Sequence, residues 1–341
     1  MYQFQCDYNE GAAPRIIERL SQTNFEQTVG YGEDSYCEHA RELIRKACGA
    51  DNADVHFLVG GTQTNATVIS SILRPHQGVL CAASGHINVH ETGAIEHSAH
   101  KVLAIESENG LLQADQIKAA LDAHYNDPNS EHMVQPGMVY ISFPSEFGTL
   151  HSLEQLEAIS SVCHEAGVPL FIDGARMGYG LCGEGNKVTL KDIARLADVF
   201  YIGGTKQGAL FGEAVVITAD SLKKDFRYHI KQGGGMLAKG RLLGLQFEAL
   251  FEDNLYFDLA QEAVDKALLI RDALLAKGYS CYMYSPTNQQ FFILPDKQIA
   301  ELSDRFLFSD WGRYDEESSV VRICTSWATK DEAVAELIEA L

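Results

Sequence analysis

Residues 198–208 read Asp-Val-Phe-Tyr-Ile-Gly-Gly-Thr-Lys-Gln-Gly, and they anchor the prediction of the fold. Apolar residues of β-branched and aromatic type predict a buried strand, which two glycines end. Lys206 follows on a short turn, where burial disfavours the ammonium form and lowers the pKa from about 10.4. Such a lysine attacks carbonyl groups and forms Schiff bases. We therefore expect Lys206 to bind a carbonyl cofactor, most simply pyridoxal phosphate; a solvated loop lysine is the alternative.

The composition is that of an ordinary folded protein. With 341 residues, 46% of them hydrophobic, the chain can form one large and one smaller domain. The net charge of −20 argues against partners such as nucleic acid or an anionic membrane. No apolar run approaches the roughly 20 residues that span a bilayer, and no signal peptide is visible. The eight scattered cysteines favour reduced thiols in the cytoplasm over disulfides or a zinc site.

A glycine turn near residue 60 is a candidate phosphate site. The residues 54–59 predict a strand, and Gly60-Gly61-Thr62-Gln63 leads from it into a helix with apolar spacing. Backbone N–H groups at such a helix start attract anions. We assign this turn to the cofactor phosphate, with an ordinary capped turn as the alternative. It is not a Walker loop, because no Gly-Lys-Ser/Thr follows.

His86 follows the predicted strand 78–83, at a strand end where ligand sites of α/β sheets gather. There it can stack on a flat heteroaromatic ring. His90, His97 and His100 lie nearby, but no metal-binding His-Glu-x-x-His spacing supports a metal site. We expect no metal here, and surface or core positions for these three.

Asp173 ends the apolar strand 168–172, and Arg176 lies three residues further on. A carboxylate at this place can keep a pyridinium nitrogen protonated, so that the ring acts as an electron sink. About one helix and one strand separate Asp173 from Lys206, which places both at the same edge of a parallel sheet. A helix cap is the alternative for Asp173 taken alone.

The last ninety residues predict a small α/β domain. Helical spacing from 237 to 276 is broken by acidic residues near 252–254, where we place the domain boundary. Arg322 lies within the apolar run 320–324, and a buried arginine requires a partner. That partner is a substrate carboxylate or a structural ion pair. Expected strands are 280–283, 290–293 and 320–324, and expected helices are 299–304 and 330–341.

These features together resemble the threonine aldolase and β-eliminating lyase family. The resemblance spans nearly the whole chain. It implies the α/β fold of type I of pyridoxal-phosphate-dependent enzymes, like that of aspartate aminotransferase. In this fold a large domain, residues 1–250, is built on a mostly parallel seven-stranded sheet, and residues 251–341 form a small domain. Its motifs are Phe4-Gln5-Cys6-Asp7 through Pro14, Tyr31-Gly32-Glu33-Asp34, Gly61-Thr62-Gln63-Thr64-Asn65, His86 with Glu91, Asp173-Gly174-Ala175-Arg176, Lys206 and Arg322.

The resemblance also implies roles for individual residues. Family members form dimers or dimers of dimers with shared sites, which Tyr31, Lys231, Lys239 and Arg241 would complete. By resemblance, Lys206 binds the cofactor covalently, His86 stacks on its ring and Asp173 pairs with its nitrogen. The cofactor phosphate is held by Gly61, Thr62 and Gln63, and Arg176 lies beside the cofactor. Arg176 and Arg322 bind the substrate carboxylate, with Cys6 and Tyr31 nearby.

Two positions depart from the family pattern. Cys6 stands where many members have a serine that helps to bind the carboxylate. Ser145 and Glu146 stand where well-studied members have a histidine that contacts the substrate hydroxyl.

The resemblance implies cleavage of the Cα–Cβ bond of a β-hydroxy-α-amino acid to glycine and an aldehyde, with threonine, allo-threonine or a phenylserine-like compound as substrate. His86, Glu91 or a bound water would take the hydroxyl proton. The alternatives are a β-elimination that releases ammonia and a keto acid, and a catalytically silent binding protein.

Overall fold

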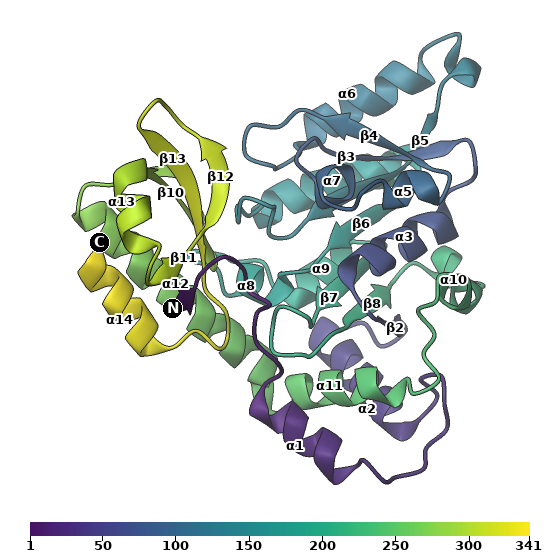
Figure 1. Cartoon of the computed structure of the whole chain (residues 1–341). Helices are drawn as coiled ribbons and strands as arrows, with labels where there is room; N and C mark the ends of the chain where they lie inside the picture. The colour runs from purple at the N-terminus through teal and green to yellow at the C-terminus, as the bar shows by residue number, and fades with distance from the viewer.

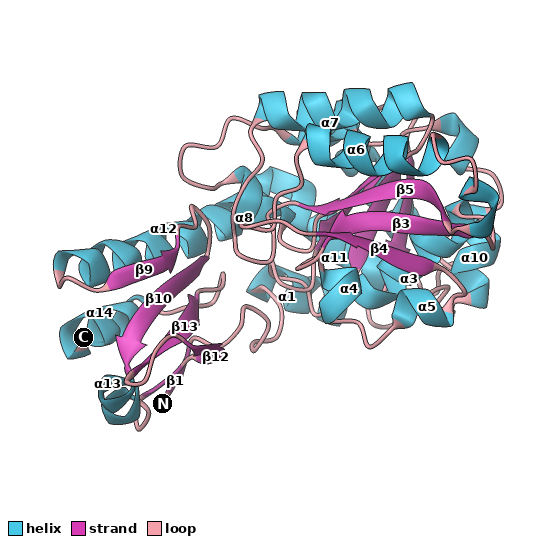
Figure 2. Cartoon of the chain, turned by 90° about the horizontal axis from the view of Figure 1, so that it is seen from above, coloured by secondary structure: helices cyan, strands magenta, loops and turns pink.

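A seven-stranded sheet with helices on both faces forms the larger of two lobes (Figures 1 and 2). The computed structural model describes the whole chain, residues 1–341. Six strands run parallel and one, β8, is antiparallel to both of its neighbours. The expected mostly parallel seven-stranded sheet is therefore confirmed. In sheet order the strands are β2 (Asp54–Leu58), β8 (Glu213–Ile217), β7 (Val199–Gly203), β6 (Leu170–Asp173), β5 (Gln135–Ser142), β3 (Gln77–Ala82) and β4 (Lys101–Ile105).

Alternate residues of the central strands pack against different helices. Ile172 and Phe200 belong to a core with helices α2, α7, α9 and α11, whereas Phe171 and Tyr201 belong to a core with α3, α5 and α10. Burial on both faces explains why these strands are almost continuously apolar. The helices of this lobe are α1 (Pro14–Gln22), α2 (Ser35–Cys48), α3 (Gly61–Ile72), α4 (His86–Val89), α5 (Ala94–His97), α6 (Ala114–Tyr125), α7 (Leu153–Ala166), α8 (Met177–Leu181), α9 (Leu190–Leu196), α10 (Phe226–Gln232) and α11 (Arg241–Phe251).

The carboxyl ends of β6 and β7 approach each other closely. A Cβ atom on Gly174 would lie 2.0 Å from the carbonyl oxygen of Tyr201, and one on Gly203 would lie 2.3 Å from that of Ala175. Only glycine fits at these two positions. The segments that follow the two strands, which carry Asp173 and Lys206, are therefore held side by side at one edge of the sheet.

The smaller lobe is a four-stranded antiparallel sheet, in the order β12-β13-β10-β9, backed by α12 and α14. Phe292 and Ile323 of the sheet share a core with Ile270 and Leu337 of these helices. Its elements are α12 (Leu255–Ala276), β9 (Ser280–Met283), β10 (Gln289–Pro295), α13 (Asp296–Leu302), β11 (Phe306–Leu307), β12 (Ser309–Arg313), β13 (Ser318–Cys324) and α14 (Asp331–Ala340).

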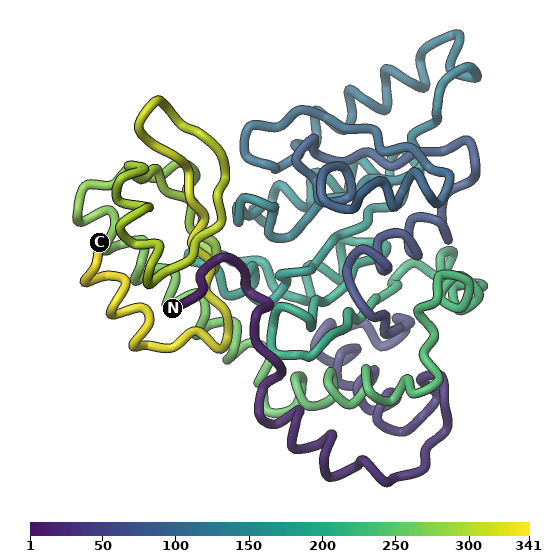
Figure 3. The backbone as a smooth tube through the Cα atoms, viewed as in Figure 1, coloured from purple at the N-terminus to yellow at the C-terminus, as the bar shows by residue number.

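The first residues of the chain pack with this smaller lobe. The strand β1 (Tyr2–Gln3) pairs in parallel with β11, and Phe4 is buried in the small core. In Figure 3 the N-terminal trace runs from the smaller lobe to the larger one. The division expected from the sequence, 1–250 and 251–341, placed these residues in the large domain instead. None of the helices combines the length and apolarity that crossing a membrane requires.

The acidic break near residue 252 is a short 3-10 helix, Glu252–Asn254, between α11 and α12. The first helix, α1, begins at Pro14, a residue favoured in the first turn of a helix. Lys231 and Gln232 are the last two residues of α10.

Candidate active site

Lys206 lies on the turn between β7 and β8 and lines a cavity of about 750 Å³. Burial lowers the pKa of this lysine, and the neighbouring charge of Arg176 lowers it further. The carboxylates of Asp7, Asp173 and Glu213 oppose this shift without reversing it. A lowered pKa increases the fraction of neutral amine, which is the form that attacks a carbonyl carbon.

Asp173 is a buried carboxylate that lines the same cavity and is fixed by four donors. Its Oδ1 accepts from the Tyr201 hydroxyl (2.5 Å) and the Ala175 N–H (2.9 Å). Its Oδ2 accepts from the Tyr140 hydroxyl (2.6 Å) and the Asn65 side-chain amide (3.1 Å). This network fixes the orientation of the carboxylate, as pairing with a protonated ring nitrogen requires.

His86, the first residue of α4, is oriented by a carboxylate behind it. Glu91 Oε1 lies 2.8 Å from His86 Nδ1 and accepts from the Asn65 amide at 2.7 Å. Glu91 is 5% exposed and does not line the cavity. Glu91 therefore lies behind His86, where it can orient the ring. The side-chain amide of Asn65 donates to both Glu91 and Asp173 and so connects the two carboxylates.

The start of α3 offers free backbone donors to the same cavity. Gly61 and Thr62 line the cavity, and the first helical amide with a partner is that of Thr64, which donates to Gly60 O at 3.0 Å. The amides of residues 61–63 are therefore available to an anion. The side chain of Gln63 points elsewhere, because it bonds to Val59 N and Gly233 O.

Arg176 forms a buried ion pair with Asp7. Its Nε and Nη2 donate to the two carboxylate oxygens at 2.7 and 3.0 Å, and Asn288 donates to Asp7 Oδ2 at 2.9 Å. Burial alone would raise the pKa of Asp7, but the charges of Arg176 and Lys206 outweigh it and lower the pKa to about 2. Only Nη1 of Arg176 makes no hydrogen bond within the chain.

Arg322 reaches the cavity from the smaller lobe. Its Nη1 donates to Gln289 Oε1 at 3.1 Å, and its Nη2 donates to Gln5 O and Ser309 Oγ at 2.8 and 3.2 Å. Its guanidinium lies 5.5 Å from the centre of the Trp311 ring, and its buried Nε has no partner. No carboxylate of the chain pairs with this arginine, so its charge is available to a ligand.

The structure brings most of the expected site residues into one cavity. Cys6 and Tyr31 do not line it: Cys6 Sγ bonds to Asn9, and Tyr31 packs under Lys231, whose Nζ lies 4.8 Å from the ring centre. The expected residues that line the cavity are Gly61, Thr62, His86, Asp173, Arg176, Lys206 and Arg322.

Other polar groups of the cavity were not expected from the sequence. Tyr201 lines the cavity, and Tyr140 does not, but the hydroxyl groups of both bond to Asp173. Their positions in β7 and β5, the neighbours of β6, were a usable signal. Glu213, which lines the cavity, was not predicted as a site residue either. Burial raises its pKa to about 8, while hydrogen bonds from Thr205 Oγ1 (2.8 Å) and Gly204 N (3.1 Å) oppose the shift. Trp311 lines the cavity as well, and so do Ser145 and Glu146, which depart from the family pattern.

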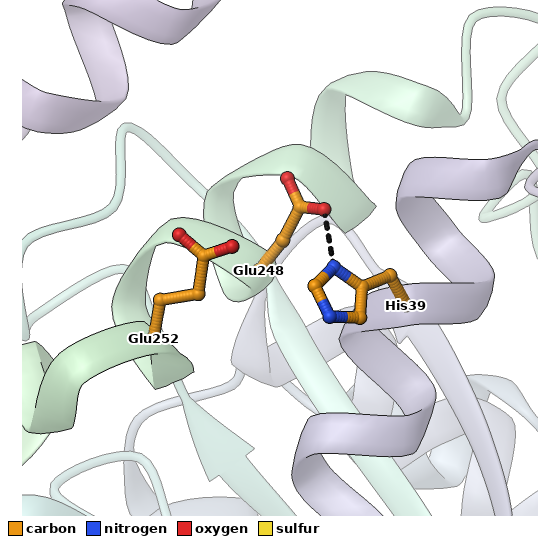
Figure 4. Close-up of side chains that lie close together, drawn as sticks. All are labelled: His39, Glu248 and Glu252. Carbon is orange, nitrogen blue, oxygen red and sulfur yellow. Dashed lines mark hydrogen bonds and ion pairs between the residues drawn. The ribbon is translucent and has the colours of Figure 1, made fainter.

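Figure 4 shows a cluster of three side chains, His39, Glu248 and Glu252, none of which lines the cavity. His39 Nδ1 lies 2.7 Å from Glu248 Oε1, and Arg19 bonds to both carboxylates, with 2.5 Å to Glu248 Oε2. The guanidinium of Arg19 supplies the positive charge that a metal ion would bring. We read the cluster as an ion-pair network that joins α1, α2 and α11.

Comparisons with known proteins agree with this geometry. A family model described as beta-eliminating lyase matches residues 3–288. The low specificity L-threonine aldolase of Pseudomonas sp. (strain NCIMB 10558) is 28% identical over 344 residues, which cover 98% of this chain and 95% of that protein.

Solved structures are similar as well. A structure of Leishmania major threonine aldolase is 43% identical, with a TM-score of 0.97 over 99% of this chain and 98% of that one. A mutant aspartate aminotransferase of Thermus thermophilus is 14% identical, with a TM-score of 0.73 over 100% of this chain and 90% of that one. The latter likeness concerns the fold alone.

Proposed function

Because the chain belongs to the beta-eliminating lyase family, we propose that it is a pyridoxal-phosphate-dependent aldolase that cleaves β-hydroxy-α-amino acids to glycine and an aldehyde. The observation that carries the proposal is the joint placement of Lys206, Asp173 and the unpaired Arg322 around one cavity. The relatives that are 28% and 43% identical over nearly the whole chain are threonine aldolases, which favours carbon–carbon cleavage over β-elimination.

The residues of the cavity fit this cofactor. The amides at the start of α3 suit its phosphate, Asp173 suits the ring nitrogen, and Lys206 suits the carbonyl carbon. His86, held at Nδ1 by Glu91, suits the face of the ring. When bound there, pyridoxal phosphate supplies an electron sink for the pair left on the substrate α carbon.

We assign the substrate carboxylate to Arg322, with Arg176 Nη1 as the second donor. Arg322 has the free charge and the unpartnered Nε, whereas Asp7 already engages two nitrogens of Arg176. Gripping the carboxylate fixes rotation about the Cα–N bond, so that the bond to be broken can be aligned before the reaction. Cys6 lies outside the cavity, and its expected contact with the substrate requires a movement of the N-terminal segment.

We further propose a homodimer or a dimer of dimers in the cytoplasm. Apolar side chains are exposed on the segment between α1 and α2 and on α10: Phe25 is 94% exposed, Val29 66% and Tyr228 77%. A partner would bury them, and Tyr31 and Lys231, which lie beside them, would then reach a neighbouring site. All eight cysteines are free, which supports a reducing compartment.

Product analysis tests the proposed reaction. The purified enzyme, loaded with pyridoxal phosphate, is incubated with threonine, allo-threonine and phenylserine, and the products are identified by mass spectrometry and NMR. We expect glycine with acetaldehyde or benzaldehyde in equal amounts. Ammonia with a keto acid would contradict aldol cleavage and favour β-elimination, and no turnover of any of these compounds would refute the proposed substrate class.

A further inference from the structure

We propose that Glu146 is the catalytic residue that takes the proton from the β-hydroxyl group of the substrate. This inference rests on the proposed function and deepens it, because it names the base for the cleavage. Glu146 lies in the segment after β5, at the same edge of the sheet as Asp173 and Lys206, and its side chain lines the cavity with theirs.

One oxygen of this carboxyl group is held and the other is free. Oε1 accepts from Ser142 Oγ at 2.7 Å and from the backbone N–H of His86 at 2.9 Å. Oε2 has no hydrogen-bond partner in the chain, and it is not fully buried. Glu146 therefore presents one oriented acceptor to the cavity, beside the residue expected to stack on the cofactor.

The two other buried carboxylates that line the cavity, those of Asp173 and Glu213, are already engaged. Asp310 also lines the cavity, but it is an exposed residue on the smaller lobe, and its Oδ1 accepts from Gly312 N at 2.8 Å. Both oxygens of Asp173 accept two hydrogen bonds each, and the two oxygens of Glu213 accept from Thr205 Oγ1 and Gly204 N. Glu91 lies behind His86 and does not line the cavity. His86 remains the rival base through its Nε2, because its Nδ1 is occupied by Glu91.

The surroundings of Glu146 suit proton transfer. Burial raises the pKa of its carboxyl group and the charge of Asp173 adds to this, whereas the bonds from Ser142 and from the His86 backbone act against it. Other titratable groups near it are Tyr140 on β5, Cys81 on β3 and His86 on α4. A carboxylate with a raised pKa is a stronger base, and its conjugate acid holds the proton more readily.

The step balances without any oxidant or reductant. The proton of the β-hydroxyl passes to Glu146 Oε2, the electron pair of the O–H bond becomes the second bond of the aldehyde C=O, and the Cα–Cβ bond breaks. Its electron pair stays on the α carbon, which gains a proton to give glycine. Glu146 returns its proton to solvent or to the α carbon before the next cycle.

The test separates the β-hydroxyl step from the chemistry at the α carbon. Glu146→Gln keeps an oxygen for Ser142 and His86 but has no base at the second position. Two rates are measured on this variant with the bound cofactor: cleavage of phenylserine, and exchange of an α hydrogen of glycine for deuterium in D₂O, followed by NMR. Glycine has no β-hydroxyl, so its exchange does not need the proposed base.

We expect cleavage to fall by about 100-fold or more, the usual contribution of a general base, and exchange to stay within about threefold of wild type. Glu146→Asp, which keeps a carboxylate one methylene shorter, should recover part of the cleavage. Glu131→Gln, an exposed surface change, should leave both rates unaltered.

Unchanged cleavage in Glu146→Gln would overturn the inference and leave the proposed function standing. An equal loss of both rates would also overturn it, because Glu146 would then act on the structure of the whole site. A wild-type enzyme that exchanges glycine but cleaves no β-hydroxy amino acid would refute the proposed function itself. If Glu146→Gln does not fold, Glu146→Asp decides by the same comparison: equal losses of both rates contradict the inference.

Discussion

The lowered pKa of Lys206 results from burial and from neighbours that come from distant parts of the sequence. Burial and Arg176 lower its pKa, and the charge of Arg176 is in turn held in place by Asp7 near the N-terminus. Asp7 is fully buried, so the pair is shielded from solvent. At the scale of residues, the site therefore depends on an ion pair as well as on the lysine itself.

The first prediction concerns this pair. Asp7→Asn removes one charge and leaves the buried guanidinium of Arg176 without a counterion, which costs about 3–5 kcal/mol of the free energy of unfolding. Urea denaturation near pH 7 measures the loss. The matched control is Asp122→Asn, which breaks an exposed pair with Lys118 on α6 and should have little effect.

The effect of Asp7→Asn should depend on pH in a defined direction. The pKa of Asp7 is about 2 in the folded chain, below its ordinary value of 3.8. The folded state thus binds this proton less readily than the unfolded state, so the stabilisation is complete above about pH 4 and is lost as the pH falls through 2. The difference between wild type and variant should shrink in that range, and a constant difference would argue against the pair.

At the scale of elements, local patterns sufficed to place some strands. The expected strand at 280–283 has the bounds of β9, and the expected strand before Gly203 is β7. All five residues of β7 are buried, as its apolar run indicates. The placement of Asp173 and Lys206 at the same edge of the sheet could be predicted, because one helix and one strand of a parallel sheet separate them.

Elements defined by distant partners could not be predicted in this way. The strand β1 has only two residues and exists because β11 pairs with it. The two tyrosines that bond to Asp173 could be assigned only once the neighbours of β6 were known. The free oxygen of Glu146 likewise follows from the folded positions of Ser142 and His86.

At the scale of the whole molecule, one face of the larger lobe carries the apolar side chains that a partner would cover. Phe25→Asp should convert the proposed oligomer to a smaller species, because it places a charge in the interface. Since Phe25 is 94% exposed in the single chain, the change should leave the fold intact. Multi-angle light scattering gives the mass, and circular dichroism checks the fold.

Tyr314→Asp is the control for this experiment. Tyr314 is 55% exposed on the smaller lobe, away from the proposed interface. It should keep the wild-type mass. A wild-type protein that is already a monomer would contradict the proposed assembly and the sharing of sites through Tyr31 and Lys231.

The covalent role of Lys206 is the central claim, and one measurement tests it most directly. An absorbance spectrum of the purified protein with pyridoxal phosphate is recorded before and after borohydride, and the reduced protein is mapped by peptide mass spectrometry. We predict a visible band that borohydride removes, with the reduced cofactor on the peptide that contains Lys206. Lys206→Ala should show neither, whereas Lys101→Ala, an exposed control, should show both. Absence of cofactor binding, or a label on another lysine, would contradict the account.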